Sequence, residues 1–419
     1  MNIDAYFDKL EQERNGKSFA FLAERVERSA ENPYSIAVAK TIKPEETLVL
    51  ILAGSGGRGK HLRGYNGYLK QVDEFIKSQP EFKDKNVRIC VAVCSEGNYH
   101  GTKTARDLKY FKSWGDDEYV NNALSNMSAE VKEENLHPAY IQDIFDLAIK
   151  PKLDAAGNNP ETIKHYMRKI NTVSHCHGGY VALSLEEMIQ QRMTEQNISS
   201  KEQKKVFDNM LYLNYAPDCP IQGIKSQFIS VESSQDDHNQ WQSHLKEYCQ
   251  MEKPDFGLVR MPRDAGNILM CAKIDKSGVE GNPPPQRIVK KVDEDGFFVA
   301  PQQQENATEE PAEEKFADEH SFLGFKPKSN MSKGAIKMQT FANNILKNAV
   351  ANSLKQSKEK FIPLPNVRHL AAETKEQFLE FTKAYFKAHQ LFIKYRMADK
   401  QKLHSFIYWH QNNRISLED

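Results

Sequence analysis

The residues of this chain best placed for chemistry lie in the run Ser-His-Cys-His-Gly-Gly at 174–179. An apolar segment precedes this run and a helix-forming segment follows it. A strand that passes directly into a helix through the pattern small-x-nucleophile-x-small forces its central residue into a strained conformation. Cys176 stands at that centre, with Ser174 and Gly178 as the small residues on either side. The spacing therefore predicts a nucleophilic thiol at Cys176, lifted clear of a sheet.

This run resembles the nucleophile elbow of lipase-like α/β-hydrolases, whose usual form is Gly-His-Ser-x-Gly-Gly. Cys176 stands where that family has its serine, and Ser174 stands where it has its first glycine. The resemblance implies an α/β fold with a mostly parallel sheet and helices on both faces. It also implies a hydrolase or acyltransferase with a cysteine or serine nucleophile, which acts on a small-molecule or lipid-like acyl substrate.

Two later segments supply residues for the acid and base positions that the resemblance implies. Asp236 and Asp237 follow a strand-like segment at 226–231, where such a hydrolase has its carboxylate. The same residues also fit the acidic first turn of an ordinary helix. His320 lies on a loop before a long helix predicted at 338–356, which matches the chain order nucleophile, acid, histidine. His320 is therefore the first choice for the base.

A glycine-rich loop follows the apolar run 47–53, which has the pattern of a buried parallel strand. In the hydrolase interpretation, Gly56 or Gly57 supplies one amide of the oxyanion hole. His177, the residue after the nucleophile, supplies the other amide. A strand-to-helix turn that binds no ligand is an alternative interpretation of the loop.

Two alternatives to acyl chemistry stay open. The loop Gly54 to Lys60 matches the first seven positions of the phosphate-binding pattern GxxxxGK[ST], with His61 where Ser or Thr is required. Ser174, together with the His-x-x-x-Glu pattern of His369 and Glu373, is similar to a motif of bacterial effectors that transfer AMP from ATP. The rival hypothesis is therefore a nucleotide-dependent AMP-transferase. The second alternative is a catalytically inactive interaction protein on a hydrolase-like fold.

The histidines that flank Cys176 also invite a metal interpretation. Consecutive residues do not easily converge on one ion, and the sequence has no second ligand pair with zinc spacing. The neighbours of an elbow nucleophile project away from its centre, so neither His175 nor His177 is assigned as the base. We therefore predict no metal and no cofactor.

Composition restricts the partners and the compartment. The chain has 57 basic and 57 acidic residues, a balance that argues against a nucleic-acid partner. Six scattered cysteines without a CxxC pair indicate reduced thiols. No apolar run approaches the ~20 residues that cross a bilayer, and no signal-peptide pattern is present. We expect a cytoplasmic protein, or one secreted without an N-terminal signal, as bacterial effectors are.

The order of segments predicts four parts. Residues 1–45 are expected to form a helical lead-in, and 46–300 an α/β core with a helical cap inserted at about 100–165. The segment 301–320 is acidic and of low complexity. Residues 321–419 would hold a last core helix and a Lys-rich helical region, whose basic face offers a docking surface for a host or cellular protein.

Overall fold

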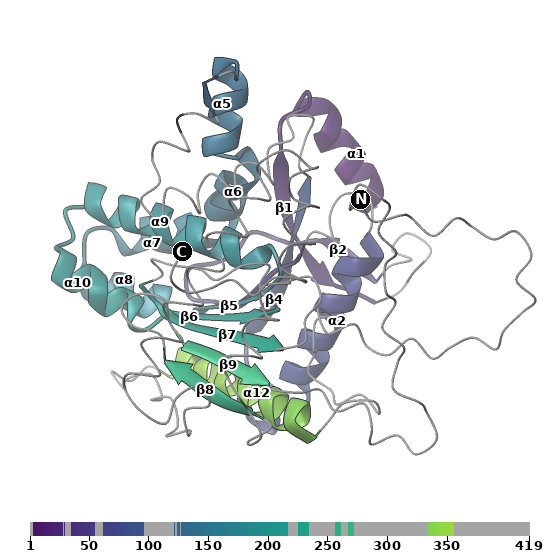
Figure 1. Ribbon diagram of the computed structural model, residues 1–419, viewed down its shortest axis with the longest axis vertical. Coiled ribbons are helices and arrows are strands. Elements are labelled where there is room, and N and C mark those ends of the chain that lie inside the picture. The colour runs from purple at the N-terminus through teal and green to yellow at the C-terminus, as the bar shows by residue number, and fades with distance from the viewer. Residues whose placement is uncertain are drawn as a thin grey trace, which may run out of the picture.

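The structure, a computed structural model, describes residues 3–27, 29, 35–54, 62–95, 121, 124–125, 127–216, 225–233, 256–260, 267–271 and 333–355. These residues form one mixed sheet of nine strands with helices on both faces (Figure 1). The strands are β1 (Phe19–Arg25), β2 (Ile36–Val38), β3 (Thr47–Leu52), β4 (Val87–Ser95), β5 (Ile170–His175), β6 (Leu211–Tyr215), β7 (Gln227–Ser233), β8 (Phe256–Arg260) and β9 (Asn267–Cys271). Their order across the sheet is β2-β1-β4-β3-β5-β6-β7-β9-β8.

The centre of the sheet is a block of parallel strands in the order β4-β3-β5-β6-β7-β9. Both β3 and β5 are buried along their full length, as strands covered on two faces must be. The mostly parallel α/β sheet expected from the sequence is therefore confirmed. Because parallel strands point one way, their carboxyl ends share one edge of the sheet. At that edge β5 lies between β3 and β6.

The first 45 residues differ from the predicted helical lead-in. Only α1 (Ile3–Glu13) is helical among the described residues there. Strand β1 pairs antiparallel with β4, and β2 pairs antiparallel with β1, so both extend the sheet. The reason lies in the apolar run 19–23, whose periodicity does not distinguish a strand from a buried helix. Each residue of this run is buried. At the opposite edge β8 pairs antiparallel with β9.

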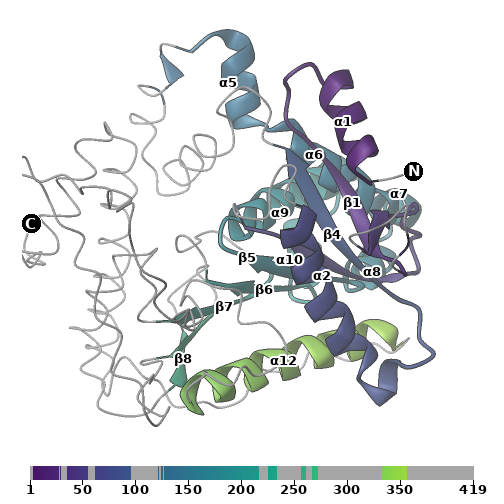
Figure 2. The ribbon, with the colours of Figure 1, turned by 90° about the vertical axis from the view of Figure 1, so that its right-hand side faces the viewer.

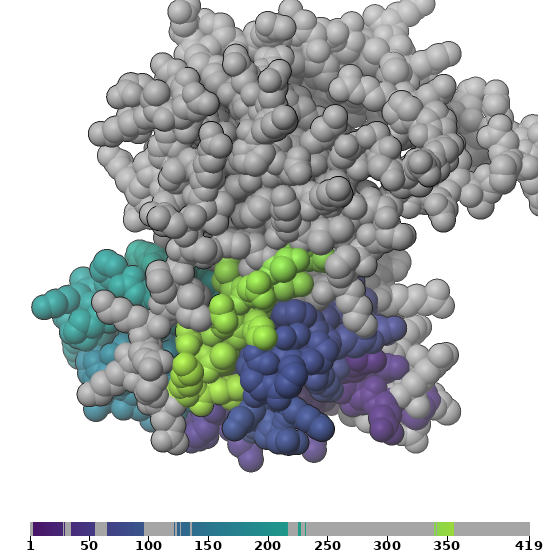
Figure 3. Space-filling view, turned by 90° about the horizontal axis from the view of Figure 1, so that it is seen from below, coloured from purple at the N-terminus to yellow at the C-terminus, as the bar shows by residue number. Residues whose placement is uncertain are grey.

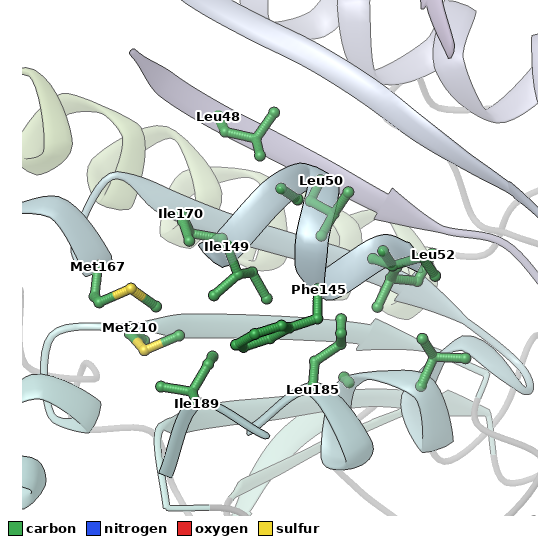
Figure 4. Close-up of a cluster of buried hydrophobic side chains, with 14 of the residues drawn as sticks. Leu48, Leu50, Leu52, Phe145, Ile149, Met167, Ile170, Leu185, Ile189 and Met210 are labelled. Carbon is green, nitrogen blue, oxygen red and sulfur yellow. The ribbon is translucent and has the colours of Figure 1, made fainter. Parts of the chain in front are cut away.

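One face of the sheet is covered by the helices that connect β4 to β5 and β5 to β6. They are α5 (Ala129–Leu136), α6 (Ala139–Ile144), a π-helical turn (Phe145–Ile149), α7 (Lys150–Ala156), α8 (Pro160–Met167), α9 (Gly178–Glu195) and α10 (Ser200–Phe207). Figure 4 shows Phe145 and Ile149 packed with Leu50 of β3 and with Leu185 and Ile189 of α9 in one apolar cluster. This cluster joins the crossover helices to the sheet.

The other face is covered by α1, α2 (Leu62–Lys77) and α12 (Lys333–Leu354), with a 3₁₀ turn (Pro80–Phe82) after α2. Figure 2 shows α12 running along the sheet below β6 and β7, and Figure 3 shows it beside α2. Leu69 of α2 and Leu346 of α12 belong to the same buried cluster. The long helix predicted at 338–356 is confirmed, with an earlier start.

Several predicted parts are described incompletely. The insertion expected at about 100–165 is helical in its described part, where it forms a layer on the sheet face. The acidic segment 301–320 and the C-terminal residues 356–419 lie outside the described residues. Among the helices that the structure describes, none has the length and apolar character needed to span a membrane.

Candidate functional site

The turn between β5 and α9 has the strained conformation expected of an elbow. Strand β5 ends at His175 and α9 begins at Gly178, so two residues make the turn. Cys176 has φ +51°, a left-handed conformation that costs a non-glycine residue ~1–3 kcal/mol. Its amide donates to the Tyr215 carbonyl at 3.0 Å, which ties the turn to β6. The surrounding sheet therefore holds Cys176 in a backbone conformation that it would otherwise avoid.

Gly178 explains why a small residue follows the elbow. A Cβ at this position would lie 2.2 Å from the Leu52 carbonyl oxygen, far inside any real contact distance. The first turn of α9 therefore crosses directly over the end of β3. Only glycine permits this approach, as the spacing of the motif predicts.

Gly54 brings the chain after β3 against the nucleophile. Strands β3 and β5 are neighbours with Leu52 opposite Ser174, so Gly54 stands level with Cys176. A Cβ on Gly54 would lie 2.8 Å from Cys176 Cβ and 2.8 Å from His175 Nδ1. The glycine-rich loop therefore starts in contact with the elbow, where an oxyanion-hole loop is required. The rest of this loop, with Gly56 and Gly57, lies outside the described residues, so its role stays a prediction.

Tyr68 of α2 completes the described surroundings of the thiol. Its hydroxyl oxygen lies 2.8 Å from His175 Nδ1, and the nearby Gly54 amide acts to lower the pKa of the phenol. Burial, followed by the negative charge of a nearby Cys176 thiolate, raises the pKa of Tyr68 to about 12. The phenol is therefore protonated near neutral pH. The Cys176 side chain is 6% exposed, so access to it is narrow.

Sequence reasoning missed Tyr68. A tyrosine on an amphipathic helix is most often a packing residue, and nothing in its spacing marks it. The one available signal is that α2 follows directly on the loop from β3. Such a helix must begin beside the carboxyl edge of the sheet.

Ser174 lies inside the fold. It is 0% exposed, and its hydroxyl donates to Asn214 Oδ1 at 2.9 Å. The two residues face each other in the register of β5 and β6. Ser174 is therefore a cross-strand partner under α9, while His175, the next residue, points to the opposite face toward α2.

His177 is also buried, with 1% exposure. Its Nε2 lies 3.5 Å from the hydroxyl of Tyr140 on α6, and its ring lies 5.2 Å from that of Tyr180. The imidazole is thus part of the packing between α6 and α9. The oxyanion role of the His177 main-chain amide stays a prediction.

The remaining candidates lie outside the described residues, and their roles stay predictions: Asp236, Asp237, His320, His369 and Glu373. Strand β7 ends at Ser233, three residues before the first of the two aspartates. It is separated from β5 only by β6. In the part of the chain with described structure, no three His, Cys, Asp or Glu residues gather in a way that would hold a metal ion.

Comparison with known proteins adds no family to this geometry. No protein-family model matches the chain, and no curated protein matches it either.

Proposed function

We propose that this protein is a hydrolase or acyltransferase of the lipase and esterase type, with Cys176 as its nucleophile. The observation that carries this proposal is the left-handed backbone of Cys176, φ +51°, at a strand-to-helix turn in the middle of a parallel sheet. Strained conformations of non-glycine residues persist where the surrounding structure imposes them, and they concentrate at active sites.

The proposed reaction has two halves. In the first, the Cys176 thiol gives its proton to His320 and its sulfur forms a bond with the acyl carbon. The amide of His177, with Gly56 or Gly57, binds the oxyanion, and His320 returns the proton to the leaving group. In the second half, water or an acceptor alcohol or amine attacks the thioester and frees the thiol. Asp236 or Asp237 orients the imidazole.

The arrangement of the sheet supports these assignments. The loop that would supply the second oxyanion amide starts at Gly54, in contact with the nucleophile. The two acid candidates follow β7, which is separated from β5 by β6 and lies on the side of β5 away from β3. The nucleophile, the oxyanion loop and the acid would thus converge on the carboxyl edge, where open α/β sheets bind their ligands.

The burial of Ser174 favours Cys176 over Ser174 as the nucleophile. A hydroxyl that is 0% exposed and bonded to Asn214 has no path to a substrate without opening the β5–β6 pairing. The AMP-transferase hypothesis, which uses Ser174, gains no support from this position. It remains an outcome that the test must be able to reveal.

The test is covalent labelling of the folded protein. The wild type is exposed to a thiol-directed acyl-mimic probe and, separately, to a fluorophosphonate, and the modified residue is located by mass spectrometry after digestion. We expect fold-dependent labelling at Cys176, abolished by Cys176→Ala and reduced less than threefold by Ser174→Ala. Cys90 provides an internal control, because burial raises the pKa of its thiol to about 12.

Three results would contradict the proposal. Labelling of Cys90 and Cys176 to the same extent would mean that the elbow does not activate its thiol. A clear ATP-dependent thermal shift, lost in Ser174→Ala and kept in Cys176→Ala, would favour nucleotidyl transfer. A folded protein that neither reagent labels would favour an inactive interaction protein.

A further inference from the structure

Tyr68 is the described residue that contacts both sides of the elbow and has no part in the proposed reaction. Its hydroxyl oxygen lies 2.8 Å from His175 Nδ1, and the nearby Gly54 amide acts to lower the pKa of the phenol. The two rings are 5.5 Å apart and inclined at 40°. One hydroxyl therefore lies where three segments meet: helix α2, the end of β5 and the chain that leaves β3.

Cys176 lies next to the point where these three segments meet. The point where a Gly54 Cβ would stand is 2.8 Å from both Cys176 Cβ and His175 Nδ1. Those two atoms are therefore separated by no more than twice that distance. The carbon that bears the nucleophilic sulfur thus lies against Gly54. A shift of Gly54 would change both the access to the thiol and the loop that starts there.

The sulfur itself also lies within electrostatic reach of the Tyr68 hydroxyl. A thiolate at Cys176 contributes, after burial, to the raised pKa of Tyr68. A like-charge effect of this kind acts over a few ångströms in a buried site. A protonated phenol at this distance is compatible with a thiolate, whereas a second anion is not.

We propose that Tyr68 is a positioning residue for Cys176: by bonding His175, which lies against Gly54, it fixes the start of the glycine-rich loop against the nucleophile. The inference rests on the proposed function in one respect, that Cys176 is acylated. Loss of the hydroxyl would free His175 and loosen its contact with Gly54. The thiol would then become easier to reach and harder to acylate, because acylation also needs the loop in place.

The same helix offers a matched control in Tyr65, one turn earlier. Tyr65 is 1% exposed, and its hydroxyl accepts from the Cys94 amide at 3.1 Å and donates to the Cys94 carbonyl at 3.3 Å. Cys94 lies on β4, two strands away from β5. Tyr65→Phe thus removes a hydroxyl with two main-chain hydrogen bonds from α2, away from the elbow.

The experiment compares two reactions of Cys176 in the wild type, Tyr68→Phe and Tyr65→Phe. Acylation by p-nitrophenyl acetate is followed as a nitrophenolate burst and by intact mass. Alkylation by iodoacetamide is followed by peptide mapping. In Tyr68→Phe we expect acylation to slow at least tenfold and alkylation to accelerate at least threefold. In Tyr65→Phe both rates should stay within threefold of wild type, with thermal unfolding recorded for each variant.

The outcomes separate the two proposals. If Tyr68→Phe and Tyr65→Phe behave alike, the positioning role is wrong and the proposed function stands. If the wild type is alkylated but never acylated, the proposed function is wrong, and faster alkylation in Tyr68→Phe alone still supports positioning. In that case, equal alkylation of the wild type, Tyr68→Phe and Tyr65→Phe overturns the positioning role.

A second pair of variants covers the case in which Tyr68→Phe does not fold. His175→Leu removes the other end of the hydrogen bond and should repeat both rate changes. His175→Gln keeps a group that can bond to the Tyr68 hydroxyl and should recover at least half of the lost acylation rate. Identical rates in the Leu and Gln variants would overturn the inference.

Discussion

The two edges of the parallel sheet bury polar side chains in opposite ways. At the amino edge, Lys152 of α7 is fully buried and donates to three carbonyl oxygens of the segment before β3. These belong to Lys43 at 3.3 Å, Pro44 at 2.8 Å and Glu46 at 2.6 Å. One ammonium thus bonds three carbonyls, of which that of Lys43 also accepts from the Glu46 amide at 3.2 Å.

Two more cations at this edge also bond to main chain. Arg168 Nη2 donates to the Lys355 carbonyl at 2.8 Å, and Lys169 Nζ donates to the Ser353 carbonyl at 3.2 Å. Both acceptors lie at the carboxyl end of α12, whose dipole favours positive charge. The cations therefore join the start of β5 to the helix that covers it.

The carboxyl edge has a different organisation. There the hydrogen bond between Tyr68 and His175 joins two side chains. It lies next to Cys176, whose backbone is strained. The amino edge uses its buried polar groups to connect elements. At the carboxyl edge Tyr65 also connects two elements, but the pair of Tyr68 and His175 lies beside one thiol, at a place of local strain. We infer that stability resides mainly at the first edge and chemistry at the second.

The strongest test of this division is Gly54→Ala. The added Cβ would lie 2.8 Å from Cys176 Cβ, and neither atom is the end of a flexible side chain. The elbow must shift, and a nucleophile displaced by about 1 Å loses on the order of a hundredfold in rate. We expect acylation of Cys176 by p-nitrophenyl acetate to fall by about that factor.

Gly67→Ala is the control for this substitution. Gly67 lies on α2, and a Cβ there would meet no atom within 4 Å. Alanine in an exposed helix position stabilises by roughly 0.5–1 kcal/mol relative to glycine. Acylation should be unchanged in Gly67→Ala. Equal losses of acylation in Gly54→Ala and Gly67→Ala would contradict a special role of the carboxyl edge.

The next largest effect is expected at the amino edge, in Lys152→Met. The substitution keeps much of the side-chain volume and removes a fully buried donor that bonds three main-chain carbonyls. We expect a loss of about 3 kcal/mol in the free energy of unfolding, measured with urea. Acylation of Cys176 in the folded variant should stay within threefold of wild type. A large loss of acylation with normal stability would contradict the division between edges.

Lys150→Met serves as the control on the same helix. Lys150 makes a surface pair with Asp146 at 3.9 Å, with its side chain 47% exposed. Exposed pairs of this kind contribute ~0–1 kcal/mol. Lys152→Met and Lys150→Met therefore make the same chemical change, the first at a buried position and the second at an exposed one.

Much of this arrangement could be predicted from the sequence. Strand β3 is a continuous apolar run, and the turn at 174–179 has its small residues at the required spacing. Gly178 was predicted only as the small residue two positions after the nucleophile, and the structure adds its close approach to Leu52 of β3. Strand β1 was not predicted, because a run buried on both faces carries no period of 2. Strand β2 was not predicted either, because its three residues are too few to show a period.

The contacts of the site could not be predicted from the sequence. Tyr68 and His175 are 107 residues apart, and only the adjacency of β3 and β5 brings them together. The same holds for Lys152, whose acceptors are main-chain atoms more than 100 residues away. Long-range pairs without a motif leave no local signal in a sequence.

The smallest expected effect is a pH dependence of stability from Lys152. Burial, with repulsion from Lys169 second, lowers the pKa of Lys152 to about 7. The unfolded chain, with an ordinary lysine pKa of about 10.4, then binds the proton more tightly than the folded chain does. Stability therefore increases as the pH rises from about 7 toward about 10. The three carbonyl acceptors favour the ammonium and oppose this trend, so the increase is smaller than the pKa alone implies.

The measurement is the free energy of unfolding of wild type minus that of Lys152→Met, at pH values from about 7 to about 9. Taking the difference removes the contributions of all other titrating groups that the two proteins share. We expect the difference to grow by about 1 kcal/mol over this range. A flat difference would mean that the carbonyls hold the ammonium as firmly as water does. The amino edge would then bury its charge without a cost, and the contrast with the strained carboxyl edge would be sharper still.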